Sequence, residues 1–267
     1  MRIPVQIKEA DMKEILEIIN EIAKEYTTDA SKCAYCSHDS EIQELLSEDS
    51  LERFRAITKA IGYPLKDFDY EFHQLFDAGD GNEELSILMQ TWITLGSSLE
   101  NALQIFLAIY LSDYKNSGWG KWEEFNYETV KSEIYKALDS VSSSDLADDK
   151  RRSLKKLIKE YLKTRKETTQ LEKLNLQNLI SFYIRYVWSE ESCFEELDII
   201  RQYRNCIHSF KKREIGEWDR LLQSLKFYCA LLIDLRSRIP DVDDILSYKA
   251  ELRAEYASYY RGYEYYE

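Results

Sequence analysis

Residues 87–111 read ILMQTWITLGSSLENALQIFLAIYL, within the longest apolar segment of a chain of 267 residues. A membrane-spanning helix needs about 20 predominantly apolar residues. This stretch is long enough, but it carries Glu100, Asn101 and two glutamines. We therefore predict that 83–114 forms a buried helix with a weak point at Gly96, and that the chain does not enter a membrane.

Outside this segment, apolar residues recur at steps of three and four, which is the period of an amphipathic helix. The chain has only 8 Gly and 3 Pro, so turns are scarce and long regular elements are favoured over many short strands. The only stretch with a convincing strand period is RIPVQI at 2–7. The sequence therefore predicts an all-α fold. Further helices are expected over 8–26, 40–61, 126–139, 146–168, 170–189, 191–212, 216–238 and within 243–257.

Turn-forming residues suggest how the chain is divided. Two turn clusters, GYP and AGDGN, fall between residues 62 and 82, and Pro240 interrupts the chain near its end. We predict an acidic, mostly helical N-terminal region over 1–80, a helical bundle over 81–240, and a tyrosine-rich C-terminal segment over 241–267.

Charge is unevenly distributed along the chain. The formal net charge is −13, which argues against broad nonspecific binding to nucleic acid. Residues 1–84 contain 20 acidic and 9 basic residues, whereas 150–173 contain 10 basic and 3 acidic residues. One part of the chain is thus strongly acidic, and another contains a strongly basic helix.

Residues 201–210 read RQYRNCIHSF and contain one of the three histidines. On a helix, Arg201, Arg204, Asn205 and His208 follow one stripe. An imidazole transfers protons near neutral pH, and a guanidinium binds phosphate oxygens. Together they suffice for metal-free cleavage of a phosphodiester by an internal 2′-hydroxyl. A solvated or structural role for this stripe is the alternative.

This stretch, late in an all-helical bundle, resembles the motif of the HEPN family: an arginine, usually a polar residue after it, and four to six residues before a histidine. Residues 90–111 resemble the long first helix of that family, which often carries an acidic residue at a position like Glu100. The resemblance covers about 85–238. Six residues separate Arg201 from His208. Arg204 is followed by Asn, which is frequent in the motif, but only three residues separate it from His208. Each arginine therefore fits part of the motif.

The resemblance implies a HEPN-like bundle that forms a homodimer and acts as a metal-independent endoribonuclease without a cofactor, within a toxin–antitoxin or anti-phage system. His208 would be the general acid or base, and Arg201 or Arg204 would bind the scissile phosphate. Asn205 would orient them, and Glu100 would be a supporting acid. The expected partners are RNA and an antitoxin or regulatory protein. The residues expected to bind RNA are Arg152, Lys155, Lys159 and Lys211. The first three lie on the basic helix predicted over 146–168, for which a solvated charged face is the alternative interpretation.

Two other functions remain open. One is a catalytically inactive HEPN-like module that binds a protein or nucleotide partner. The other is an unrelated helical scaffold protein whose Arg–His stripe lies on the surface.

The cysteines and the N-terminus bear on metal binding and location. Cys33 and Cys36 have the spacing of a zinc knuckle, but no second CxxC completes it, and a reduced pair is the favoured alternative. We predict no metal site. The N-terminus lacks the apolar core of a signal peptide, and we expect a cytoplasmic protein.

Overall fold

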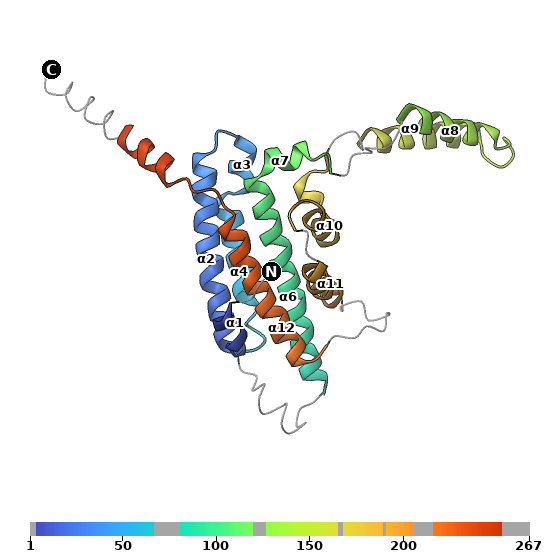
Figure 1. Cartoon of the computed structure of the whole chain (residues 1–267). Coiled ribbons are helices and arrows are strands. Elements are labelled where there is room, and N and C mark those ends of the chain that lie inside the picture. Colours follow the sequence, from blue (N-terminus) through green and yellow to red (C-terminus); the bar gives the residue numbers. More distant parts are fainter. Residues whose placement is uncertain are drawn as a thin grey trace, which may run out of the picture. The chain divides into compact units, whose positions relative to one another are not determined.

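The computed structural model describes residues 4–66, 81–119, 127–164, 168–188, 191–205 and 216–252. Within these ranges every regular element is helical, which confirms the predicted all-α class (Figure 1). No helix in the same ranges is long and apolar enough to cross a membrane.

The N-terminal part begins with a short helix where the alternation of RIPVQI predicted a strand. Helix α1 spans Val5–Glu9, and the carbonyl of Pro4 accepts hydrogen bonds from the amides of Ile7 and Lys8. The strand prediction is therefore wrong for the described residues of that stretch. A six-residue alternation fits one face of a helix nearly as well as a strand, and here it buries only Ile7.

Helix α2, Met12–Cys36, starts at a capping box. The Asp11 carboxylate accepts from the amide of Glu14 at 2.8 Å, and the Glu14 carboxylate accepts from the amide of Asp11 at 3.1 Å. This cap explains why the predicted helix begins four residues later than residue 8. Two helices follow, α3 (Ser40–Leu45) and α4 (Glu48–Ala60), with a break at Leu46 and Ser47 that the pattern over 40–61 did not indicate.

Helix α6, Gly81–Ile109, is the central element. It contacts α2 and α4 and also three later helices, and Figure 1 shows it running alongside α12. These later helices are α10 (Leu176–Tyr186), α11 (Glu191–Arg204) and α12 (Trp218–Ser237). The predicted helix over 83–114 is interrupted at Tyr110, after which α7 spans Leu111–Asn116.

Buried tyrosines attach the surrounding helices to α6. The Tyr26 hydroxyl of α2 donates to the carbonyl of Ala102 at 2.9 Å, and the Tyr183 hydroxyl of α10 donates to the carbonyl of Leu103 at 3.0 Å. Both side chains are fully buried, so these bonds satisfy phenol groups that would otherwise be costly to remove from water.

A chain of hydroxyl groups crosses the same core. The Thr58 and Ser98 hydroxyls lie 2.6 Å apart, as do those of Ser98 and Tyr228, so α4, α6 and α12 are joined by consecutive hydrogen bonds. All three residues are buried.

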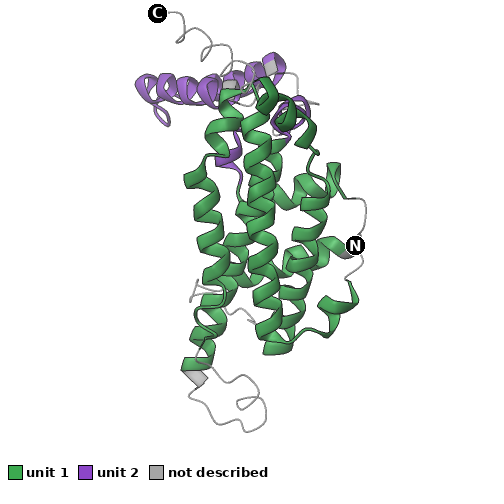
Figure 2. Cartoon of the chain, turned by 90° about the vertical axis from the view of Figure 1, so that its left-hand side faces the viewer, with its two compact units in different colours: residues 1–109, 175–267 green, residues 110–174 purple. Residues whose placement is uncertain are grey.

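Packing divides the chain into two compact units, drawn in different colours in Figure 2. Unit 1 comprises 1–109 and 175–267, and unit 2 comprises 110–174. The predicted boundaries near 80 and 240 do not coincide with this division. The reason is that α2 and α4 bury their apolar faces against α6 and α12, so the N-terminal helices share one core with the later ones.

Unit 2 contains α7, α8 (Tyr127–Ser140), α9 (Asp148–Thr164) and a short 3-10 helix, Leu171–Lys173. Helices α8 and α9 pack against each other as a hairpin. Among the side chains of the hairpin that the structure describes, only Leu162 is buried. The hairpin therefore has almost no core of its own.

Candidate functional site

The close packing of α6 and α11 depends on the absence of a side chain at Gly96. A Cβ placed there would lie 2.6 Å from Cδ and 2.7 Å from Cβ of Arg204. The aliphatic part of Arg204 thus lies directly on the backbone of α6. The weak point of the predicted helix is therefore a place where α11 packs close to α6.

One turn further along α6, Glu100 forms an ion pair with the Arg204 guanidinium. The side chains are only 17% and 28% exposed, respectively, so water screens this pair less than it screens a surface pair. Glu100 and Arg204 were both predicted as site residues, and the structure brings them together. Neither periodicity nor composition placed them in contact; only the resemblance put both in one site.

Arg201 is held within its own helix. Its Nε donates to the Asp198 carboxylate at 2.8 Å, and the same carboxylate accepts from the Gln202 amide at 2.5 Å. Asp198 was not predicted as a site residue, although its position three residues before Arg201 is the spacing at which helical side chains meet.

Asn205 was expected to orient an arginine side chain. In the structure its Nδ2 donates to the backbone carbonyl of Arg201 at 3.0 Å, next to the last residue of α11. This bond satisfies a carbonyl of the last helical turn. His208 and Lys211 lie outside the described residues.

An aromatic contact also joins α6 and α11, one turn before Gly96. The ring centres of Trp92 and Tyr203 are 4.7 Å apart. Tyr203 also lies against Gly216, whose φ is +73°. A Cβ at Gly216 would be 3.1 Å from the Tyr203 ring. Neither Trp92 nor Tyr203 was predicted as a site residue, because their pairing joins residues far apart in the chain.

The remaining predicted RNA-binding residues lie on α9 in unit 2. Lys155 forms an ion pair with Asp139 at 2.6 Å, and its ammonium group lies 5.2 Å from the centre of the Tyr135 ring. Arg152 and Lys159 are exposed. The predicted set is therefore heterogeneous, because one of its members is held inside the α8–α9 hairpin.

Cys33 and Cys36 lie in the last turn of α2. The Cys33 thiol is 3.9 Å from the carbonyl of Pro240, and burial raises the pKa of Cys33 to about 11, so the thiol stays protonated at neutral pH. His38 is exposed, and His73 is outside the described residues. Within the described ranges, no group of three or more His, Cys, Asp or Glu side chains is arranged to hold a metal ion.

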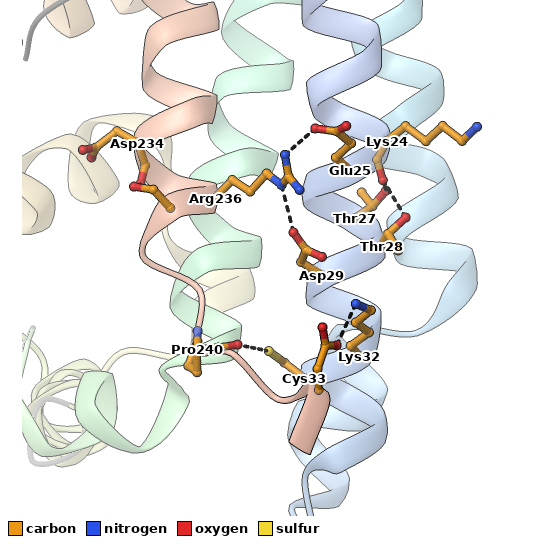
Figure 3. A network of polar contacts seen from close by, with 12 residues as sticks. Lys24, Glu25, Thr27, Thr28, Asp29, Lys32, Cys33, Asp234, Arg236 and Pro240 are labelled. Carbon is orange, nitrogen blue, oxygen red and sulfur yellow. Dashed lines mark hydrogen bonds and ion pairs between the residues drawn. The ribbon is translucent and has the colours of Figure 1, made fainter. Parts of the chain in front are cut away.

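A second polar site joins α2 to the end of α12 (Figure 3). Arg236 reaches between Glu25 and Asp29, and its Nε donates to Asp29 at 2.8 Å. The hydrogen bond to Asp29 raises the pKa of Arg236 further. Lys32 pairs with Asp243 at 2.9 Å, and these residues line a pocket of about 220 Å³. The Arg236 pairs thus join α2 to the last turn of α12, and the Lys32 pair joins α2 to the chain beyond α12.

Comparison with known proteins adds no relative to this description: no family model, no curated protein and no solved structure matches the chain.

Proposed function

We propose that this chain is a HEPN-like, metal-independent endoribonuclease of a toxin or anti-phage system, acting as a homodimer on RNA. The observation that supports this best is the contact between Glu100 and Arg204. The resemblance assigned both residues to one site although 103 residues separate them in the sequence. A chance Arg–His pattern on a helix would not require its arginine to meet that particular carboxylate.

The ion pair leaves Arg204 able to bind phosphate. A guanidinium has five N–H donors, and one carboxylate uses at most two of them in a bidentate pair. Glu100 would hold the planar group in place and reduce the conformational freedom that Arg204 loses when it binds a phosphate. Arg201, tethered by Asp198, has the same capacity, so both arginines remain candidates.

In the proposed reaction, the 2′-oxygen of a ribose attacks the adjacent phosphorus and its proton passes to a base. The bond from phosphorus to the 5′-oxygen breaks, and the leaving oxygen takes up a proton. His208 of one or both subunits would transfer these protons, and an arginine would stabilise the charge on the phosphorane. The products would carry a 2′,3′-cyclic phosphate and a 5′-hydroxyl.

A second candidate is a catalytically inactive HEPN-like module that binds a protein or nucleotide partner. It is favoured by the same pairs, since both guanidinium groups are already neutralised by carboxylates of this chain. The net charge of −13 also favours it.

Cleavage of total RNA in EDTA by the unsubstituted chain, His208→Ala and His38→Ala separates the two candidates. His38 is an exposed histidine and serves as the matched control. We expect the unsubstituted chain and His38→Ala to cleave RNA and His208→Ala to be inactive. Equal cleavage by His208→Ala would contradict the mechanism, and a folded but inactive unsubstituted chain would support the binding module.

The same assay assigns the arginine. Arg201→Gln and Arg204→Gln remove one guanidinium each, and the loss of a group that stabilises the transition state reduces the rate by about 100-fold or more. The variant with the larger loss of kcat identifies the arginine that contacts the phosphate.

A further inference from the structure

The cations of α9 fall into two groups with different environments. Arg151 and Lys155 are held within the α8–α9 hairpin: Arg151 pairs with Asp148 at 3.1 Å and Lys155 pairs with Asp139 at 2.6 Å. Arg151 also donates to the carbonyl of Val141 at 2.6 Å. These two side chains are therefore committed to the structure of the hairpin.

Arg152, Lys156 and Lys159, which we call the basic stripe, are different. All three are exposed, and none makes a hydrogen bond, ion pair or ring contact within the part of the chain that the structure describes. Their spacing of four and three residues puts them on one face of α9, over about 10 Å along the helix axis. Asp149 and Glu160 border this face on one side.

A third face of α9 carries exposed apolar side chains. Leu154, Leu157 and Tyr161 are 39%, 60% and 54% exposed, and their positions on the helix lie roughly opposite the basic stripe. A helix that lies on an anionic membrane buries its apolar face, with the cations around that face reaching the headgroups. Lys150 is also exposed and without a partner in the described ranges, and it lies on the apolar side of the helix. The three cations of the basic stripe, however, would point away from the membrane, which argues for a polyanion in water.

We propose that the basic stripe docks the phosphate backbone of single-stranded RNA. The choice of RNA rests on the proposed function, whereas the need for an extended polyanion rests on the three unpaired cations. Binding displaces counterions from the phosphates. A cation whose charge is already offset by a carboxylate of the protein contributes less to this gain than an unpaired one. Lys156, absent from the predicted set, belongs to the site, and Lys155, which was predicted, does not.

The test compares two triple variants of the full chain that lose the same charge. The stripe variant is Arg152→Gln/Lys156→Gln/Lys159→Gln. The control variant is Lys131→Gln/Lys136→Gln/Lys155→Gln, whose three lysines are ion-paired within the same hairpin. Gln has nearly the helix propensity of Lys and Arg, so both should fold, which circular dichroism verifies.

The measurement is the Kd for a labelled single-stranded RNA of about 16 nucleotides as a function of salt concentration, with all chains carrying His208→Ala to prevent cleavage. The stripe variant should bind about tenfold more weakly at about 0.1 M salt and reduce the slope of log K against log salt by about 2. The control variant should keep the slope of the parent chain. Equal losses in the two variants, or no loss in the stripe variant, would overturn the proposal.

Two further readouts separate this proposal from its alternatives. Vesicles of anionic lipid are titrated with the same chains; loss of vesicle binding with unchanged RNA binding in the stripe variant would overturn the proposal in favour of a membrane surface. Cleavage is measured with chains that keep His208. RNA binding that depends on the stripe, without cleavage, would contradict the proposed nuclease and leave the stripe assignment intact. Cleavage together with RNA binding that does not depend on the stripe would support the nuclease and overturn the stripe assignment.

Discussion

The core of unit 1 and the α8–α9 hairpin of unit 2 are both helical, but they use their side chains in opposite ways. In unit 1, large residues such as Trp92, Phe54 and Tyr228 are fully buried, and the motif arginines are paired with carboxylates. In the hairpin, Leu162 is the one buried side chain among those described, and Lys150 and the three cations of the basic stripe have no partner within the described ranges. The buried core is therefore concentrated in unit 1, whereas unit 2 carries a row of unpaired cations on one helix face.

The largest difference between the two regions should appear in thermal unfolding, when parts of each region are deleted. A chain lacking residues 1–66 loses α2 and α4, and with them the fully buried Ile15, Tyr26 and Phe54, so we expect it to have no cooperative unfolding transition. A chain in which 127–164 is replaced by a short Gly/Ser linker should keep one. Circular dichroism during thermal unfolding measures both, and a cooperative transition in the first chain would show that the N-terminal helices are a separable domain.

This contrast also determines how the acidic N-terminal region can be studied. Because its helices form part of the core, the effect of its negative charge on RNA binding cannot be tested by removing it. Substituting exposed carboxylates such as Glu41 and Glu52 with Gln would change the charge and leave the core intact.

Alkaline pH should destabilise unit 1 through its buried tyrosines. Burial raises the pKa of Tyr26, Tyr183 and Tyr228 above the ordinary value for a phenol. Above a pH of about 10 the unfolded chain releases these protons while the folded chain keeps them, so stability is constant below that pH and falls above it. Together, the three tyrosines should lower the free energy of unfolding by about 4 kcal/mol for each pH unit above that value.

Urea unfolding at about pH 8 and about pH 11 measures this slope. A Tyr183→Phe chain should lose about a third of it. If the free energy of unfolding were unchanged between the two pH values, the tyrosines would have to ionise in the folded chain, and the burial described above would be wrong.

One residue type allows a direct comparison of the two regions. Leu51 in α4 is fully buried, whereas Leu157 in α9 is 60% exposed. Leu51→Ala should reduce the free energy of unfolding by about 2–5 kcal/mol, and Leu157→Ala should change it by less than about 0.5 kcal/mol. Urea denaturation measures both. A loss above about 1 kcal/mol for Leu157→Ala would show that this face is covered in solution.

The smallest effect is expected at the contact between α6 and α11. Gly96→Ala should gain about 1 kcal/mol from helix propensity but clash with Arg204, for a net loss of about 1–3 kcal/mol. Ser97→Ala, next to it on α6, is the control and should stay within about 0.5 kcal/mol of the unsubstituted chain. Stabilisation by Gly96→Ala would contradict the close approach of Arg204.

Much of the fold follows from the period of its apolar residues. The helices predicted over 126–139 and 216–238 match α8 and α12 to within a few residues, because their apolar residues repeat regularly up to strong breaks. The breaks at Leu46 and Tyr110 and the late start of α2 were missed, since they depend on local capping and on the packing of neighbouring helices. The division into units was missed for the same reason, because it depends on which helices share a core.

The residues of the candidate site were proposed from the sequence, but their contacts could not be. Glu100 and Arg204 were named together, yet their ion pair arises from helix packing at Gly96 that no local pattern encodes. Lys155 and Lys156 are adjacent and chemically identical, and only the position of α8 makes one paired and the other free. Side-chain function at this level is decided by tertiary structure.

The most direct test of the proposed nuclease is to map the ends of RNA incubated with the unsubstituted chain in EDTA. The account predicts cleavage that leaves 2′,3′-cyclic phosphate and 5′-hydroxyl ends, because the attacking group is the ribose 2′-hydroxyl and no metal takes part. Intact RNA, or products with 3′-hydroxyl and 5′-phosphate ends, would contradict it.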